Sequence, residues 1–133
     1  MRYMLDTNIC IYAIKNKPEM VLHHLESLNP SDVCISSVTY AELAYGVEKS
    51  SSVERNRLAL LLMLVNIDIE PFDSGAAEEY GKIRADLERG GNPIGPYDMM
   101  IAGHALSLGC VLVTNNMREF ERVEGLTIEN WVQ

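Results

Sequence analysis

The stretch Tyr3-Met4-Leu5-Asp6-Thr7-Asn8 carries the main signal about the fold. Its apolar first half predicts a short buried strand, and the polar triplet that follows is typical of the start of a helix. An acidic residue is therefore expected where a strand is followed directly by a helix. In a parallel α/β fold, the carboxyl ends of strands and the amino ends of helices lie along one edge of the sheet, where ligands bind. We expect Asp6 to lie at such an edge.

Three further positions occupy comparable junctions, and we predict that they converge with Asp6. They are Glu42 after the apolar run 33–36, Asp98 after a loop rich in Gly and Pro, and Asn116 after the apolar run 110–114. Converging carboxylates raise one another's pKa unless a cation compensates them. The pattern therefore predicts a divalent metal site.

Each of these positions also has an ordinary structural explanation. Asp6 suits a helix N-cap, and Thr39-x-x-Glu42 matches a capping box. Asp98 suits the positive end of a helix dipole, and Asn115-Asn116 suits a turn. Glu119, three residues after Asn116, is interpreted as a solvated carboxylate. The shared placement of the first four positions, rather than any one of them, favours a common site.

Alternating strands and helices predict a parallel sheet covered on both faces. The expected strands are 3–5, 33–36, 65–69, 110–114 and, as a fifth, 126–128. The expected helices are 8–15, one opened by Pro18, 39–47, 53–64, 74–88 and 98–108. The longest apolar run, 58–65, is too short to span a bilayer and is predicted to be a core helix segment. A chain of 133 residues has room for one domain.

The net charge of −8 argues against nucleic-acid binding through a general basic surface. Part of this charge would belong to the metal site, and part suits a basic partner.

The three cysteines, Cys10, Cys34 and Cys110, lie in apolar runs, and their spacing matches no zinc motif. They are predicted to be buried reduced thiols. His104 lies six residues after Asp98, on another face of the predicted helix, and is not expected to be a ligand. No secretory signal is recognised, so a cytoplasmic location is expected.

On these residues the chain resembles the PIN-domain ribonucleases, and among them the VapC toxins of bacterial toxin–antitoxin pairs. The resemblance spans essentially the whole chain, and the matching stretches are 4–8, 35–43, 93–102, 113–116 and 119–120. It implies a single PIN domain over residues 1–133, an α/β/α sandwich whose central parallel sheet has four to five strands in the order 3-2-1-4-5. By the same resemblance, Asp6, Glu42 and Asp98 match the three acidic metal-site positions. Asn116 stands where many members have a fourth Asp, a departure that removes one charge.

The resemblance also implies a function, a metal and partners. The candidate catalytic residues are Asp6, Glu42, Asp98 and Asn116. The three acids among them are the candidate ligands of one or two Mg²⁺ or Mn²⁺ ions, which prefer oxygen ligands. Thr7 and Thr114 match hydroxyl positions that help to order the acidic site. The implied activity is endoribonuclease cleavage of structured RNA, and some members cut the anticodon stem-loop of initiator tRNA. A homodimer and a VapB-type antitoxin that blocks the cleft are expected, with no membrane association. Candidate phosphate contacts are Lys15, Lys17, Arg84 and Arg118.

Two other classes of protein share part of the pattern. A metal-dependent phosphatase would need a second carboxylate in an Asp-x-Asp pattern, which Asp6-Thr7-Asn8 lacks. A catalytically inactive PIN scaffold that only binds RNA or protein would not need the three acids. An RNA-cleavage assay with and without EDTA separates these alternatives.

Overall fold

Five parallel strands form the centre of the computed structural model, which describes residues 1–132. The strands are β1 (Tyr3–Leu5), β2 (Val33–Ser36), β3 (Asp68–Glu70), β4 (Val111–Val113) and β5 (Ile128–Glu129). They lie in the order β3-β2-β1-β4-β5, and all four pairings are parallel. The predicted fold class and strand order are confirmed. Because β1 lies between β2 and β4, the order of the strands reverses at β1, where a crevice is expected.

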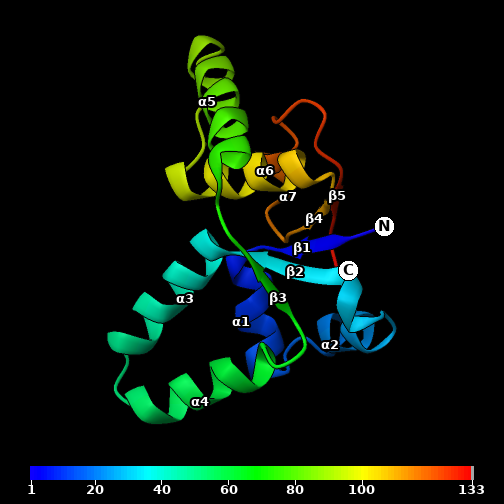
Figure 1. Cartoon of the computed structure of the whole chain (residues 1–133), viewed down its shortest axis with the longest axis vertical. Helices are drawn as coiled ribbons and strands as arrows, with labels where there is room; N and C mark the ends of the chain where they lie inside the picture. The colour runs from blue at the N-terminus through cyan, green and yellow to red at the C-terminus, as the bar shows by residue number, and fades with distance from the viewer. Residues whose placement is uncertain (133) are drawn as a thin grey trace.

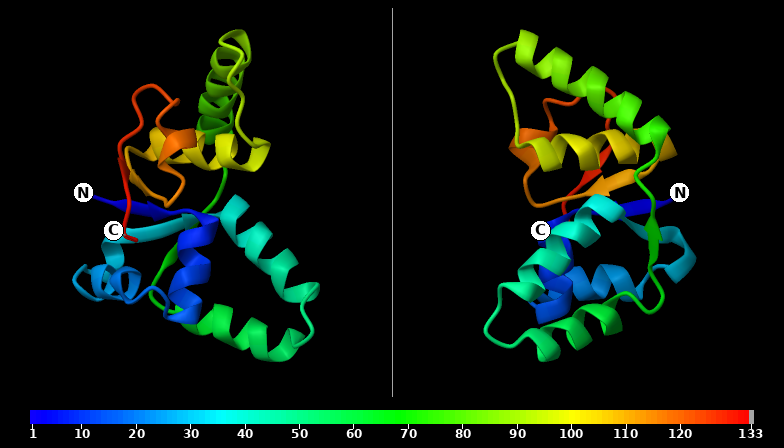
Figure 2. Two further views of the ribbon diagram at one scale, coloured as in Figure 1. Left: turned by 180° about the vertical axis from the view of Figure 1, so that it is seen from behind. Right: turned by 60° about the vertical axis from the view of Figure 1, so that its left-hand side comes forward.

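Helices cover both faces of this sheet (Figures 1 and 2). They are α1 (Thr7–Lys15), α2 (Glu19–Glu26), α3 (Ser37–Glu48), α4 (Val53–Met63), α5 (Ser74–Arg89), α6 (Pro96–Leu108) and α7 (Met117–Phe120), with a 3-10 turn η1 (Pro30–Asp32) before β2. Helices α1 to α4 lie on one face, and α5 to α7 lie on the other.

The core divides into two clusters because side chains alternate along each strand. Met4, Cys34 and Leu112 pack with α5 and α6. Their neighbours Leu5, Ile35 and Val113 pack with α1 to α4. The three cysteines are free and buried, as predicted. Among residues 1–132, no helix combines the length and apolar character needed to cross a lipid bilayer.

Several predicted boundaries differ from the observed ones, and two of the differences have local causes. Helix α3 begins at Ser37 rather than at residue 39, because the Ser36 hydroxyl accepts a bond from the Val38 N–H at 3.0 Å and caps the helix. Helix α6 begins at Pro96 rather than at residue 98, since proline suits the first helical position. Strand β3 lies at Asp68–Glu70 rather than at 65–69.

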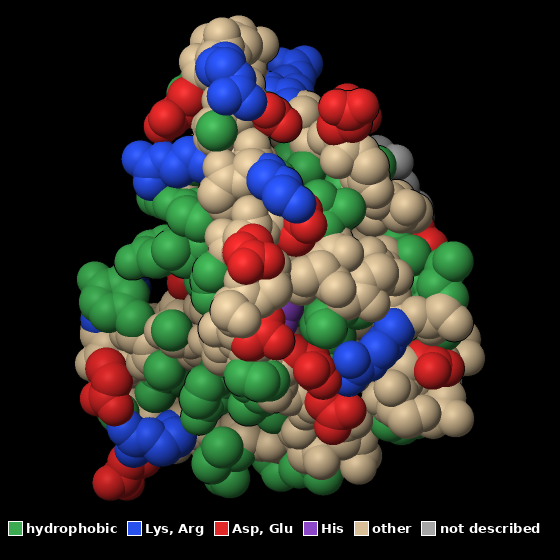
Figure 3. Space-filling model, turned by 45° about the horizontal axis from the view of Figure 1, so that its top comes forward, with side chains coloured by type: hydrophobic (Ala, Val, Ile, Leu, Met, Phe, Trp, Pro, Cys, Tyr) green, Lys and Arg blue, Asp and Glu red, His purple; other side chains and the backbone are tan. Residues whose placement is uncertain are grey.

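The prediction that residues 58–65 form a core segment is also wrong. Leu60 is buried, but Leu58, Leu61, Leu62 and Val65 are 58%, 49%, 65% and 69% exposed. Helices α3 and α4 extend away from the sheet as an arm (Figure 2), so only one side of α4 meets the core. The arm therefore presents apolar side chains to solvent, and hydrophobic side chains are prominent on the face of the molecule shown in Figure 3.

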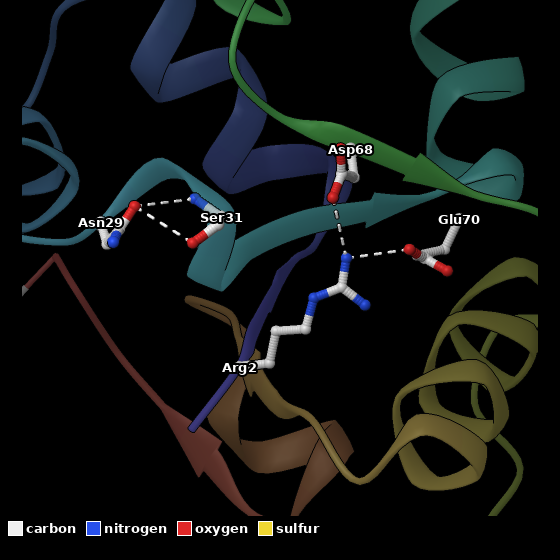
Figure 4. Close-up of polar contacts among 5 residues, drawn as sticks. All are labelled: Arg2, Asn29, Ser31, Asp68 and Glu70. Atoms are coloured by element: carbon white, nitrogen blue, oxygen red, sulfur yellow. Dashed lines mark hydrogen bonds and ion pairs between the residues drawn. The ribbon is translucent and has the colours of Figure 1, made fainter.

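Arg2 ties the central strand to the edge of the sheet (Figure 4). Its guanidinium donates to Asp68 at 3.2 Å and to Glu70 at 2.8 Å, so it bridges across β2 to β3. Helices α5 and α6 approach closely at Gly103. A β-carbon at Gly103 would lie 2.6 Å from the Tyr80 backbone nitrogen, so only glycine fits at this approach without a shift of the backbone.

Candidate active site

Asp6 follows β1 directly and begins α1. Its Oδ1 accepts a bond from the Ile9 N–H at 2.9 Å, so the side chain is the N-cap of the helix. Its own N–H donates to the Val113 carbonyl at 3.0 Å, which continues the pairing of β1 with β4. The side chain is only 4% exposed. Asp6 therefore has the structural role that its sequence suggests and is also held at the switch point of the sheet.

Glu42 does not take part in a capping box. Thr39 lies inside α3, and its buried hydroxyl has no hydrogen-bond partner within the described residues. Instead, the Glu42 Oε1 accepts a 2.7 Å bond from the Thr7 hydroxyl. Since Thr7 follows Asp6, this bond directs Glu42 toward the carboxyl end of β1.

Asp98 lies in the first turn of α6, after an N-cap, Gly95, that offers no side chain. Burial, followed by the charges of Asp6, Glu119 and Glu42, raises the pKa of Asp98 to about 6. Residues from four separate elements therefore share one electrostatic environment. Glu119, predicted to be merely solvated, belongs to this acidic cluster. Its position three residues after Asn116 was the only signal in the sequence.

Asp6 is affected in the same direction. Burial is the largest cause that raises its pKa, and the charge of Glu42 adds to it. Hydrogen bonds from the Thr114 side chain and from the Ile9 N–H oppose the rise. Thr7 and Thr114 therefore each hold one of the acids, as the resemblance implied.

Asn116 begins α7 but does not cap it with its side chain. Its N–H donates to the Thr114 hydroxyl at 2.9 Å, which places the residue at the carboxyl end of β4. The Thr114 hydroxyl thus joins the backbone of Asn116 to the carboxylate of Asp6. The amide of Asn116 is half-buried and lies at the same edge of the sheet as Asp6.

The carboxylates are close enough to repel one another, but they do not converge tightly enough to coordinate a single ion. Within residues 1–132, no three Asp, Glu, His or Cys side chains are grouped tightly enough to hold one ion between them. The present contacts explain this spread, since Asp6 caps α1 and Glu42 is bonded to Thr7. The donor chemistry is that of a hard divalent cation, because every candidate ligand is an oxygen.

The predicted phosphate-binding residues have different surroundings. Lys15 lines a cavity of about 250 Å³ together with Thr7 and Glu42, so it lies beside the acidic cluster. Arg84 instead donates to Tyr80 and Glu88 on its own helix. Lys17 and Arg118 are exposed, and Arg118 lies on α7 after Asn116.

His104 is buried and lies in a different polar contact from the acids. Its Nδ1 lies 2.7 Å from the Ser36 hydroxyl, and its ring meets Phe72 edge-on at 5.6 Å. Burial lowers the pKa of His104, which favours the neutral ring, and the Ser36 hydroxyl that it contacts also caps α3. The residue therefore connects α6, which carries Asp98, to the start of α3.

A family model described as the PIN domain matches residues 3–126 of the chain. The chain belongs to the PIN-domain family. This PIN domain is 53% identical over 131 residues to the tRNA(fMet)-specific endonuclease VapC of Shigella flexneri, and the match covers 98% of both proteins. It is 44% identical to the ribonuclease VapC2 of Rickettsia felis, with 98% of both covered. The predicted resemblance to VapC proteins is thereby confirmed.

Solved structures agree with this family assignment. The crystal structure of DNA-bound VapBC from Salmonella typhimurium contains a chain that superposes on this PIN domain with a TM-score of 0.93. The two chains are 52% identical, and the match covers 98% of each. The fold of residues 1–132 is therefore that of a VapC-type PIN domain.

Proposed function

We propose that residues 1–133 act as a single PIN domain that hydrolyses phosphodiester bonds in tRNA(fMet), with Mg²⁺ or Mn²⁺ as the cofactor. The observation that carries this proposal is the convergence of Asp6, Glu42 and Asp98 on one edge of the sheet, where burial and then the charges of Asp6 and Glu42 raise the pKa of Asp98. The choice of substrate is supported by the name of the Shigella flexneri relative, which is 53% identical over nearly the whole chain.

Asp6, Glu42 and Asp98 would hold the metal, and the Asn116 amide would offer a neutral oxygen beside them. A bound divalent ion supplies activation of water and compensation of the charge that develops on the scissile phosphate. Uncompensated carboxylates with raised pKa values fit such an ion, because its charge would remove the repulsion between them.

The residues of the chain itself orient these groups. The Thr7 hydroxyl donates a hydrogen bond to Glu42, and the Thr114 hydroxyl donates one to Asp6. These bonds fix the orientation of both carboxylates. Burial and the neighbouring carboxylates raise the pKa of Asp98 to about 6, so without a cation beside it Asp98 takes up a proton in mildly acidic solution. Lys15, beside Thr7 and Glu42, is positioned to contact a phosphate group of the RNA.

The proposal includes a VapB-type antitoxin and a homodimer as assembly partners. A cavity of about 470 Å³ is lined by residues of α1, α2 and α4, including Leu25, Leu62 and Met63. Together with the exposed leucines of α4, this cavity offers an apolar surface for a partner chain.

The net charge of −8 suits a basic inhibitor segment. Because tRNA is a cytoplasmic molecule, the proposal places the protein in the cytoplasm.

The test is cleavage of purified tRNA(fMet) and of elongator tRNA(Met) by the wild type and by three isosteric variants. Asp6→Asn, Glu42→Gln and Asp98→Asn should each lower cleavage by at least about 100-fold, since each removes one ligand charge. EDTA should abolish wild-type cleavage, and Mg²⁺ or Mn²⁺ should restore it. Asp32→Asn, on η1 at the opposite end of β2, is the matched control and should cleave normally. Near-normal cleavage by two of the three variants would show that the site is wrongly assigned.

A further inference from the structure

A groove beside the acidic cluster contains the two most exposed aromatic residues of the protein. Among the aromatic side chains of residues 1–132, only Tyr45 and Tyr97 are largely exposed, at 66% and 57%. Both line one groove of about 770 Å³, and Thr7 and Glu42 line it as well. A large ring left in solvent buries no apolar area, so core packing does not account for these two tyrosines.

The two tyrosines come from different helices, and each is close in sequence to a candidate acid. Tyr45 lies on α3, about one helical turn beyond Glu42. Tyr97 lies on α6, immediately before Asp98. Because Thr7 and Glu42 also line the groove, it adjoins the acidic cluster, where the scissile phosphate would lie.

The rest of the groove suits a chain that has flat bases and charged phosphates. Its lining also includes the apolar residues Ile11, Val38 and Met100. Lys49 also lines it, with its Nζ 5.0 Å from the centre of the Tyr45 ring. This cation stabilises the ring and adds one positive charge to an otherwise acidic region.

We infer that Tyr45 and Tyr97 form a base-stacking subsite for the unpaired nucleotides that flank the scissile phosphate of RNA. The inference rests on the proposed function and specifies how the substrate is held. Proteins that bind single-stranded RNA stack its bases on aromatic rings, which tolerates many sequences. A base paired within a helix offers no free face, so the subsite selects cleavage positions within loops.

The experiment compares Tyr45→Ala and Tyr97→Ala with the conservative variants Tyr45→Phe and Tyr97→Phe. Leu108→Ala, an exposed apolar residue at the other end of α6, is the control. Binding of a fluorescently labelled RNA hairpin with an unpaired loop is measured by anisotropy in EDTA, where no cleavage occurs. Cleavage of tRNA(fMet) is measured separately with Mg²⁺.

Each alanine variant should weaken RNA binding by about 5- to 150-fold, as loss of one stacked base does. The phenylalanine variants should stay within about twofold of the wild type, since the ring is kept. An abasic nucleotide beside the cleaved bond should weaken wild-type binding by a similar factor. The same abasic nucleotide should weaken RNA binding by the corresponding alanine variant much less, because that variant already lacks the ring that stacks on the base.

The outcomes separate this inference from the proposed function. If the alanine variants lose RNA binding while wild-type protein cleaves no RNA, the subsite stands and the nuclease proposal fails. If wild-type protein cleaves RNA and the alanine variants bind and cleave equally well, the subsite is refuted. If those variants handle RNA normally but lose affinity for a VapB-type antitoxin, the groove holds a protein segment and the inference is also overturned.

Discussion

Replacing Asp98 by Asn should stabilise the metal-free protein at neutral pH while abolishing cleavage. The rise in the pKa of Asp98 from 3.8 to about 6 corresponds, at ~1.4 kcal/mol per pH unit, to about 3 kcal/mol. This is an upper limit to the free-energy cost of ionising the carboxylate in the folded state, because partial exposure to water screens it. Asn removes the charge but also loses about 0.3–1 kcal/mol of interaction with the helix dipole. We expect a net gain of about 1–2 kcal/mol.

The sign of the pH dependence follows from the direction of the shift. A carboxyl whose pKa is higher in the folded state binds its proton more tightly there than in the unfolded chain. Wild-type stability should therefore fall as pH rises from about 4 to about 6, and the cost is fully present above that range. The advantage of Asp98→Asn should be largest at about pH 7.5 and should vanish below about pH 4.

The assay is urea unfolding in EDTA at about pH 4 and about pH 7.5, with circular dichroism as the probe. Asp32→Asn again serves as the control and should show no such pH-dependent gain. Adding Mg²⁺ should raise the unfolding midpoint of the wild type more than that of Asp98→Asn, because an ion that binds only the folded state stabilises it. An Asn variant no more stable than wild type at about pH 7.5 would refute the reasoning, as would an equal gain at both pH values.

Three further predictions concern other positions. Asn116→Asp should tighten Mn²⁺ binding and lower metal-free stability, because it adds a charge to the cluster; unchanged affinity in calorimetric titration would make Asn116 a turn residue only. Gly103→Ala should destabilise the protein by about 1–3 kcal/mol, since the methyl group would meet a backbone nitrogen of α5 at 2.6 Å. Gly81→Ala has open space and should instead stabilise α5 by about 0.5–1 kcal/mol, so equal urea midpoints for the two would contradict the packing argument. His104→Phe should cost about 1–3 kcal/mol by removing the buried hydrogen bond between His104 and Ser36, and kcat should fall more than RNA affinity; unchanged stability and kcat would show that this bond does not position the acids.

The sheet could be predicted because its information is local. The apolar runs at β1, β2 and β4 are bounded by polar residues, and alternate side chains from each strand enter the two core clusters. Family resemblance supplied the strand order, which the pairings confirm. The start of β3 was predicted too early because residues 65–69 alternate apolar and polar side chains like a strand, whereas Val65 is 69% exposed in the turn after α4.

The site was harder to predict, since each position fits a local explanation as well as a functional one. Asp6 is in fact an N-cap, so the capping explanation was correct without excluding a place in the cluster. For Glu42 the capping explanation failed because a competing cap, Ser36, starts the helix earlier. What distinguishes a site from four separate helix ends is convergence, and convergence depends on contacts between residues that are distant in the chain.

The apolar arm was missed for a related reason. Hydropathy predicts that Leu58, Leu61 and Leu62 are buried, and it does not say against what they pack. They remain exposed because α4 turns its other side to the core, where Leu60 is buried and Val53 and Met63 are partly buried. Apolar residues left exposed in this way are expected to be buried by a second chain.

The acidic net charge and an RNA substrate are compatible if recognition is short-range. RNA releases its counterions when basic residues of a protein neutralise its phosphates, and this release favours binding. A protein with a net charge of −8 gains little from this effect. Its affinity for RNA then depends on contacts made only within the groove, where a cation at the carboxylates would face one phosphate and the two tyrosines would face bases. Such contacts require an unpaired, accessible strand, so the overall charge disfavours duplex RNA in general and leaves loops as the accessible targets. The charge that first argued against a nucleic-acid-binding protein thus becomes part of the explanation for selectivity.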